Sequence, residues 1–354
     1  MRIAICTDAW HPQVNGVVRT LATTVDRLIA LGHEVTMVTP NEFFTLGMPG
    51  YHEIRLAMLP RFGTRRKLRK FAPDIVHIAT EGPIGWSARS WCKANGVPFT
   101  SAFHTRFPEY AAMRTGLSPS HFWPIMRRFH RTSYAVLVST PTLAAELAEH
   151  GIHQTALWSR GIDASVFHPA NEPLDALRNL PRPIMLNVGR VAVEKNLSAF
   201  LDANLPGTKV VVGNGPDLAQ LRARYPDVHF TGALSGKTLA RAYCSADMFV
   251  FPSLTDTFGL VMIEALACGV PVAGFAVPGP IDIVGSEGRG PRGELSEPIG
   301  ALSSDLEGAI KIALQCDRGA AARFGATYSW ESATDQFLKA LSDAAFSRRT
   351  QTAA

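Results

Sequence analysis

The sequence lacks most of the features that mark secreted, membrane-spanning and metal-binding proteins. Its 354 residues include five cysteines, an odd number without a C-x-x-C pair, so we expect ordinary thiols in a reducing cytoplasm. We expect no signal peptide, because Met1-Arg2 runs directly into a strand-like segment. D-x-D, H-E-x-x-H and His/Cys clusters with ligand spacing are missing, so neither a metal nor another cofactor is expected.

Long apolar runs are scarce, and several enzyme signatures are missing. Residues 258–281 carry one charge, but Gly269, Pro271 and later Gly and Pro residues interrupt them. A helix, a turn and a buried strand therefore fit this run better than a membrane span. No G-x-S-x-G elbow, Walker A sequence or G-x-G-x-x-G fingerprint occurs, which argues against a serine hydrolase, a P-loop nucleotidase and a dinucleotide oxidoreductase.

Positive charge is concentrated in the first half. Residues 1–160 carry 18 Lys and Arg against 10 Asp and Glu, whereas the remainder carries 17 against 20. Basic residues beside aromatics suit an anionic membrane surface. Nucleic acid is not expected as a partner because no binding motif accompanies the charge, and the alternative is a solvated helix face. The candidate membrane or acceptor residues are Arg65, Arg66, Lys67, Arg69, Trp123 and Arg127.

Strand signals alternate with helix-length segments, which predicts an α/β protein with parallel, doubly wound sheets. The strand candidates are residues 2–7, 34–39, 53–59, 75–79, 99–103 and 135–139, then 184–188, 209–212, 229–231, 248–251 and 272–275. Residues 163–183 are rich in Pro and Asn and resemble a linker. We therefore expect domains at 1–165 and 183–325, and a helix within 326–354 that packs back towards the first domain. A cleft between the domains is the expected ligand site.

The segment from Thr255 to Pro271 is the most informative about function. A helix starting near Phe258 would direct its free N–H groups at a ligand, which makes an anion site from Phe258, Gly259 and Leu260. Glu264 lies within this otherwise apolar helix and needs a polar partner. Ribose hydroxyls are one such partner, and a nearby Arg in a purely structural helix is the alternative.

Other motifs follow predicted strands. After residues 184–188, Gly189 permits a turn, and Arg190 and Lys195 are able to neutralise a diphosphate without a metal. The alternative for Lys195 is a surface ion pair with Glu194 or a neighbour, which does not explain both cations. Gly215 lies in a Gly-Asn-Gly-Pro turn that gives room beside a ligand or is simply a tight turn.

The first half holds two such motifs. Asn15-Gly16 follows the first strand and is expected to form a positive-φ turn whose amides approach a ligand. His104 follows another strand beside Thr105 and Arg106, a setting that favours function over a structural role.

With these motifs in this order, together with Glu81-Gly82-Pro83 and Arg160–Asp163, nearly the whole chain resembles family 4 of the GT-B glycosyltransferases. These retaining enzymes include bacterial α-mannosyltransferases and glycosyl-diacylglycerol synthases. The resemblance implies two Rossmann-like domains facing across a cleft.

The resemblance also implies roles for single residues. Arg190, Lys195 and the amides at 258–260 contact the donor diphosphate, and Gly189 and Gly215 belong to the same donor site. Glu264 holds the ribose, Asp256 contacts the transferred sugar, His104 lies near the anomeric carbon, and the Asn15-Gly16 loop closes over the phosphates or acceptor. Two departures stand out, because the family usually has Glu at the position of Asp256 and often has two glycines in the N-terminal loop.

The expected activity is transfer of a mannosyl, glucosyl or glucuronosyl group from a UDP- or GDP-sugar to a hydroxyl. The basic half favours a lipid acceptor such as diacylglycerol, with the enzyme peripheral on the inner face of the cell membrane. The alternatives are a soluble sugar or polysaccharide precursor as acceptor, and a non-catalytic nucleotide-sugar-binding protein.

Overall fold

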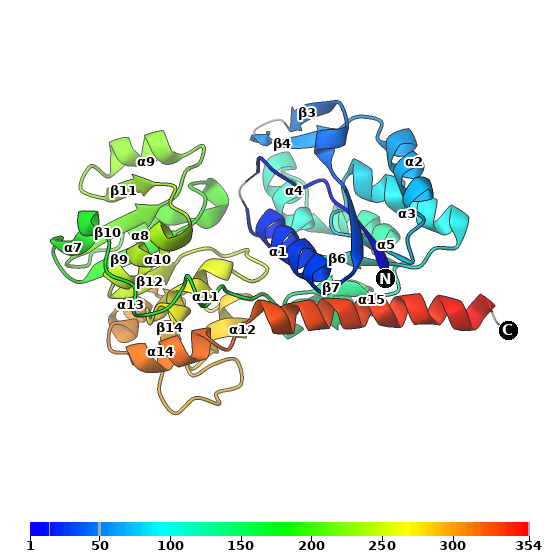
Figure 1. The fold of residues 1–354 in the computed structure, drawn as a ribbon. Coiled ribbons are helices and arrows are strands. Elements are labelled where there is room, and N and C mark those ends of the chain that lie inside the picture. Colours follow the sequence, from blue (N-terminus) through cyan, green and yellow to red (C-terminus); the bar gives the residue numbers. More distant parts are fainter. Residues whose placement is uncertain (14, 49–50, 353–354) are drawn as a thin grey trace. The chain divides into compact units, whose positions relative to one another are not determined.

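The computed structural model describes residues 1–13, 15–48 and 51–352. The chain divides into two compact units (Figure 1), the first formed by Met1–Ser159 with Trp330–Ala354 and the second by Arg160–Ser329. Each unit is built on its own six-stranded sheet.

The sheet of the first unit is parallel throughout. Its strands are, in spatial order, β2 (Glu34–Val38), β1 (Arg2–Cys6), β5 (Ile75–Ile78), β6 (Phe99–Ala102), β7 (Val136–Val138) and β8 (Thr155–Leu157). The inner strands β5, β6 and β7 are buried along their whole length. Parallel strands need covering on both faces, because their crossover connections place helices there.

The connections between these strands supply the helices. They are α1 (Gly16–Ala30), η1 (Pro40–Glu42), α2 (Arg61–Phe71), α3 (Pro83–Asn95), α4 (Phe107–Thr115), η2 (Pro119–His121), α5 (Trp123–His130) and α6 (Pro141–Glu149). Strands β3 (Thr45–Met48) and β4 (Tyr51–Ala57) form a separate antiparallel hairpin. The predicted strand at 53–59 is therefore not part of the parallel sheet.

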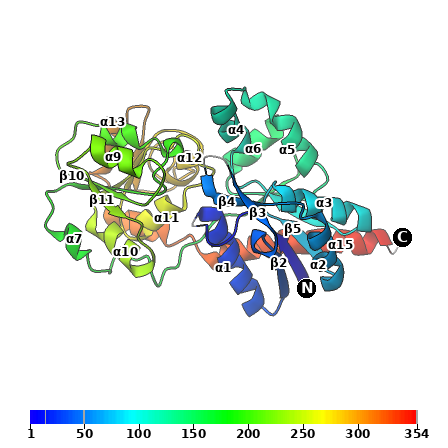
Figure 2. The same cartoon turned by 90° about the horizontal axis from the view of Figure 1, so that it is seen from above.

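The last helix, α15 (Trp330–Thr352), belongs to the first unit. Phe337 and Leu341 are fully buried in a core that also holds Ile3 and Trp158. The helix runs beside α1, as both views show (Figures 1 and 2), and Glu331 pairs with Arg27 of that helix. The apolar stripe of α15 thus contributes to the core of residues 1–159.

The second unit repeats the parallel plan. Its strands are, in spatial order, β11 (His229–Gly232), β10 (Thr208–Val212), β9 (Ile184–Val188), β12 (Met248–Phe251), β13 (Val272–Gly274) and β14 (Gly300–Leu302). Its helices are α7 (Asp175–Arg178), η3 (Val193–Lys195), α8 (Leu197–Leu201), α9 (Leu218–Arg224), α10 (Gly236–Ser245), α11 (Leu260–Ala267), α12 (Pro280–Val284), α13 (Leu306–Ala313) and α14 (Arg318–Gly325).

Residues 163–183, which resemble a linker in sequence, lie on the second unit. Phe167 and Leu177 are buried in its main core. The boundary falls between Ser159 and Arg160, before the proline-rich stretch, because these two apolar side chains tie that stretch to the sheet.

His77 of β5 is fully buried where α15 covers the sheet. Its ring lies edge-on to Trp158 and Phe337, with centroids 5.5 and 4.8 Å away, and its Nδ1 is 2.9 Å from the Thr100 hydroxyl. Burial lowers the pKa of His77 to about 3, since a charged imidazole is poorly solvated between apolar rings.

This depressed pKa predicts acid sensitivity. In the unfolded chain His77 takes up a proton near pH 6.5, whereas the folded chain resists protonation until about pH 3. Its contribution to stability is therefore present above pH 6.5 and is lost as the pH falls, at about 1.4 kcal/mol per pH unit. Between pH 7 and 5 we expect His77→Gln to lose about 2 kcal/mol less unfolding free energy than the wild type. Urea unfolding followed by circular dichroism measures the unfolding free energy of both proteins at pH 7 and pH 5. An equal loss of unfolding free energy in the two proteins contradicts the prediction.

Candidate functional site

The turns at the carboxyl ends of β9 and β10 are packed backbone against backbone. A Cβ added to Gly213 would lie 1.8 Å from the carbonyl oxygen of Gly189, and one added to Gly215 would lie 2.1 Å from that of Val191. Gly189 itself faces open space, with nothing within 4 Å of an added Cβ. Gly215 is thus required for the contact between two turns, whereas the room beside a ligand is at Gly189.

Lys195 and Asp256 form the central ion pair of this region. The Lys195 Nζ lies 2.8 and 2.6 Å from the two carboxylate oxygens of Asp256. The pair joins the loop after β9 to the loop after β12, and both side chains keep some exposure, 25% and 19%. Arg190 lies 3.9 Å from Glu194. Asp256, which is distant in the sequence, is thus an acid that pairs with the Lys195 ammonium group.

Helix α11 begins at Leu260, two residues later than predicted. Gly259 precedes it with φ of +91°, a left-handed conformation that favours glycine. Gly259 itself has no side chain to cap this end of the helix, and the first-turn N–H of Met262 donates to the Gly259 carbonyl at 2.9 Å. Phe258 is 5% exposed and packs into the main core, so only its backbone is suited to a ligand.

Glu264 is fully buried on α11. The hydroxyl of Tyr243, from α10, donates to its Oε2 at 3.1 Å, which provides part of the polar partnership that a buried carboxylate requires. Tyr243 is a site residue that sequence reasoning missed. Its only sequence signal is a tyrosine on the apolar face of an amphipathic helix, beside Leu239 and Ala240.

In the first unit, His104 follows β6 and is 8% exposed. Its ring lies edge-on to Trp158, with centroids 5.4 Å apart. The neighbouring Arg106 makes two bonds to Glu146 of α6, at 2.7 and 2.6 Å. Arg106 therefore holds α6 beside the strand end, and His104 is the member of this motif that keeps a possible ligand role.

The Asn15-Gly16 segment does not form the predicted positive-φ turn. Asn15 is extended, with φ of −152°, and its side-chain oxygen accepts from the Val18 N–H at 3.0 Å. Gly16 is the first residue of α1. The physical reason is that a helix start leaves free N–H groups, and an Asn side chain caps one of them.

Asp8, at the end of β1, explains the Glu81-Gly82-Pro83 motif. Its carboxylate accepts from the N–H groups of Ile84 and Gly85 at 2.9 and 3.3 Å and so caps α3. An added Cβ on Gly82 would lie 2.4 Å from the carboxyl carbon of Asp8. Burial raises the pKa of Asp8 to about 6. Asp8 is not among the residues that the sequence singles out.

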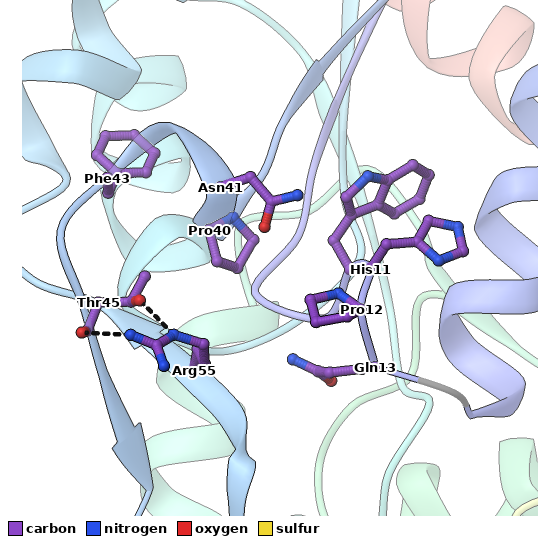
Figure 3. Close-up of a pocket in the computed structure, with 9 residues that line it drawn as sticks. His11, Pro12, Gln13, Pro40, Asn41, Phe43, Thr45 and Arg55 are labelled. Carbon is purple, nitrogen blue, oxygen red and sulfur yellow. Dashed lines mark hydrogen bonds between the residues drawn. The ribbon is translucent and has the colours of Figure 1, made fainter.

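A cavity of about 290 Å³ opens in the first unit beside the loop after β1 (Figure 3). Arg55 of β4 is held at its wall by two bonds to Thr45, from Nε to the hydroxyl at 2.7 Å and from Nη2 to the carbonyl at 3.2 Å. Rings of Trp and Phe, two side-chain amides and a guanidinium are groups suited to a polyol. The lining residues are Trp10, His11, Pro12, Gln13, Pro40, Asn41, Phe43, Thr45 and Arg55.

The residues proposed for a membrane surface fall into two groups. Arg66, Arg69 and Arg127 are exposed, while Arg65 is half-buried and Lys67 is half-buried in an ion pair with Glu42 at 2.7 Å. Trp123, which we expected to be exposed, is buried.

Trp123 is 4% exposed and stacks on His150, with centroids 3.6 Å apart. Its large apolar ring completes the core between α5 and α6. The structure instead exposes large apolar side chains at β3, in the loop between β4 and α2, and on α2 itself, which the sequence did not single out. They are Phe44, Leu46, Met58, Leu59 and Phe62.

The described residues lack two further features. No three His, Cys, Asp or Glu side chains in that part of the chain are grouped as metal ligands. Nor does it contain a helix with the length and apolar character that crossing a membrane requires.

The sequence matches two known families that together cover most of the chain. Residues 14–166 match Glycosyltransferase Family 4, and residues 182–302 match Glycosyl transferases group 1. A GDP-mannose-dependent alpha-mannosyltransferase of Mycobacterium tuberculosis is 31% identical, over 88% of this chain and 87% of the relative. A sulfoquinovosyl transferase of Arabidopsis thaliana is 31% identical over 80% and 61%, and an alpha-monoglucosyldiacylglycerol synthase of Streptococcus pneumoniae is 25% identical over 78% and 72%.

Among solved structures, sucrose-phosphate synthase from Thermosynechococcus elongatus has a TM-score of 0.72 at 24% identity, with all of both chains covered. This likeness confirms the GT-B fold, with its two Rossmann-like units. The chain belongs to Glycosyltransferase Family 4. It is a hexosyltransferase that uses a nucleotide-sugar donor.

The glycines of the second unit supply a matched test. Gly215→Ala places a methyl group against the Val191 carbonyl, and we expect it to cost about 3 kcal/mol of unfolding free energy. Gly189→Ala meets open space and should cost less than about 1 kcal/mol, yet weaken donor binding because it fills that space. Urea unfolding and calorimetry with UDP and GDP measure the two effects. Equal stability losses contradict the packing argument.

Proposed function

We propose that this chain transfers a mannosyl, glucosyl or glucuronosyl group from a UDP- or GDP-sugar to a hydroxyl of a membrane lipid, with retention of configuration. The observation that carries the donor half is the Lys195–Asp256 ion pair, which lies a few residues before the glycine-led start of α11 in the sequence. Retention follows from the family resemblance. A mannosyl donor is favoured by the 31% identical GDP-mannose-dependent relative.

Departure of the diphosphate leaves negative charge that the second unit is equipped to stabilise. Arg190, Lys195 and the first-turn amides of α11 are preorganised positive groups, each worth about 3 kcal/mol when well placed. The Lys195 ammonium has three donor hydrogens, so it can retain Asp256 and still donate to a phosphate oxygen. Asp256 thus orients Lys195 before the donor binds and then contacts the transferred sugar.

Glu264 is the residue that we assign to binding the ribose hydroxyls of the donor. A buried carboxylate accepts well from hydroxyl groups, and the Tyr243 hydroxyl at 3.1 Å fixes the position of one of its oxygens. A ligand hydroxyl would add to this partnership on α11, as an acidic residue does for ribose in other nucleotide-binding folds.

For the donor half, Lys195→Ala should lower kcat/KM with the accepted sugar nucleotide by about 100-fold. Glu264→Gln should weaken donor binding with little change in the rate at saturation, because it removes a ground-state contact to ribose.

The donor is identified with a panel of UDP- and GDP-sugars, in which transfer is measured as release of the nucleoside diphosphate. Lys237→Ala is the control, since Lys237 is exposed on α10 of the same unit. Unchanged turnover in Lys195→Ala excludes the phosphate role.

For the acceptor half, the surface beside α2 supports a lipid. Leu59 and Phe62 are 89% and 83% exposed, and Leu59 takes φ of +48°, a strained conformation for a leucine. Exposed apolar side chains next to Arg66 and Arg69 fit an anionic bilayer, which buries the former and attracts the latter. The cavity lined by Trp10, Asn41 and Arg55 is suited to the acceptor's headgroup, and the diacylglycerol-modifying relative favours a lipid over a soluble sugar.

Vesicle flotation tests this surface. Leu59→Ser with Phe62→Ser should weaken binding to phosphatidylglycerol vesicles by about tenfold or more, and Arg66→Gln with Arg69→Gln should do so in a salt-dependent way. Ile312→Ser and Arg292→Gln, exposed in the second unit, are the controls and should bind as wild type does. Arg55→Gln should raise the acceptor KM and leave flotation unchanged. Vesicle binding that is unchanged by the substitutions at Leu59, Phe62, Arg66 and Arg69 rules out this surface.

A further inference from the structure

Two cysteines of the second unit lie side by side at the C-terminal ends of α10 and α11. The Cys244 Sγ is 4.0 Å from the carbonyl oxygen of Cys268, which is 24 positions away in the sequence. The Cys268 Sγ is 4.0 Å from the carbonyl oxygen of Ala240, one helical turn before Cys244. Each thiol therefore lies against the backbone of the helix that carries the other cysteine or against the residue that ends it, and the Cys244 Sγ is also 3.4 Å from the carbonyl oxygen of His168.

The two thiols differ in access and in acidity. Cys244 is partly exposed, whereas Cys268 is 1% exposed. A hydrogen bond from the Cys268 thiol lowers the pKa of Cys244, and the positive charge of Arg318 acts in the same direction. The same hydrogen bond, together with burial, raises the pKa of Cys268. Because the thiolate is the nucleophile, Cys244 is the thiol that reacts first and Cys268 is the one that follows.

We propose that Cys244 and Cys268 form a redox-sensitive pair that closes to a disulfide on exposure to a peroxide and weakens donor binding. The Cys244 thiolate attacks one oxygen of hydrogen peroxide, which gives a sulfenic acid and hydroxide. The Cys268 sulfur then attacks the Cys244 sulfur and displaces its oxygen as water. In total the two thiols give up two protons and two electrons, and the peroxide becomes two molecules of water. A dithiol reductant reverses the bond by exchange.

The pair is connected to the donor site through two contacts. Tyr243, the residue before Cys244, donates to the Glu264 carboxylate at 3.1 Å. The Cys268 N–H donates to the Glu264 carbonyl at 3.1 Å. A disulfide holds two sulfurs at about 2.05 Å, so it draws the ends of α10 and α11 together and shifts Tyr243 relative to Glu264. This effect on binding rests on the proposed ribose role of Glu264, whereas formation of the disulfide does not.

The other cysteines of the chain provide a control. Cys6 and Cys92 are 0% and 1% exposed, and burial raises the pKa of each thiol, so a peroxide should leave them reduced. We would treat the protein with equimolar hydrogen peroxide and map disulfides by mass spectrometry of unreduced peptides. Cys268→Ser should stop at a Cys244 sulfenic acid that dimedone traps. Cys244→Ser should remain unmodified, and Cys92→Ser should oxidise as the wild type does.

Calorimetry with the accepted sugar nucleotide completes the test. We expect the oxidised wild type to bind it about tenfold more weakly, dithiothreitol to restore the affinity, and the two serine variants, checked by circular dichroism, to be insensitive. Absence of a Cys244–Cys268 disulfide, or its formation without a change in affinity, overturns the proposal. A reduced protein that binds no sugar nucleotide contradicts the proposed function instead, and the peptide map still reports on the cysteine pair.

Discussion

The ion pair between Lys195 and Asp256 is the interaction on which the candidate donor site depends. A cation that is to hold a diphosphate must be kept in place before the phosphate arrives, without being sequestered in the core. Asp256 meets this requirement through both of its oxygens, at 2.8 and 2.6 Å, while both side chains keep some contact with solvent. Although Asp256 is one methylene shorter than the family's usual Glu, it still spans the gap between the two loops.

Close backbone packing and helix α10 hold other parts of the candidate donor site in place. Gly213 and Gly215 let the turns after β9 and β10 approach each other more closely than any Cβ allows. On the other side, Tyr243 fixes the buried Glu264. Cys244 and Cys268 lie at the ends of the same two helices. Helices α10 and α11 therefore carry both Glu264, which we propose as the ribose-binding residue, and the two thiols that we propose to be redox-sensitive.

The first unit combines a cavity with a basic and apolar surface. The hairpin of β3 and β4 contributes to both, since Arg55 lines the cavity and Met58 and Leu59, just after β4, are exposed beside α2. If, as we propose, the cavity holds a lipid headgroup and the exposed surface binds a bilayer, the lipid chains that leave the cavity enter an apolar medium. The α15 helix stabilises this unit from a distant part of the sequence, with His77 enclosed between Phe337 and Trp158.

The sequence by itself determined the fold class, most of the strands, the family and the residue types at the strand ends. It did so because strand alternation and the glycine and charge motifs are local patterns that physical chemistry ties to one position in a parallel sheet. Only the tertiary structure decided which acid meets Lys195, that Tyr243 supports Glu264, that Trp123 is buried and that Asn15 caps a helix. Those outcomes depend on which side chains meet in the folded chain. A local sequence pattern does not specify contacts between side chains on different loops and helices.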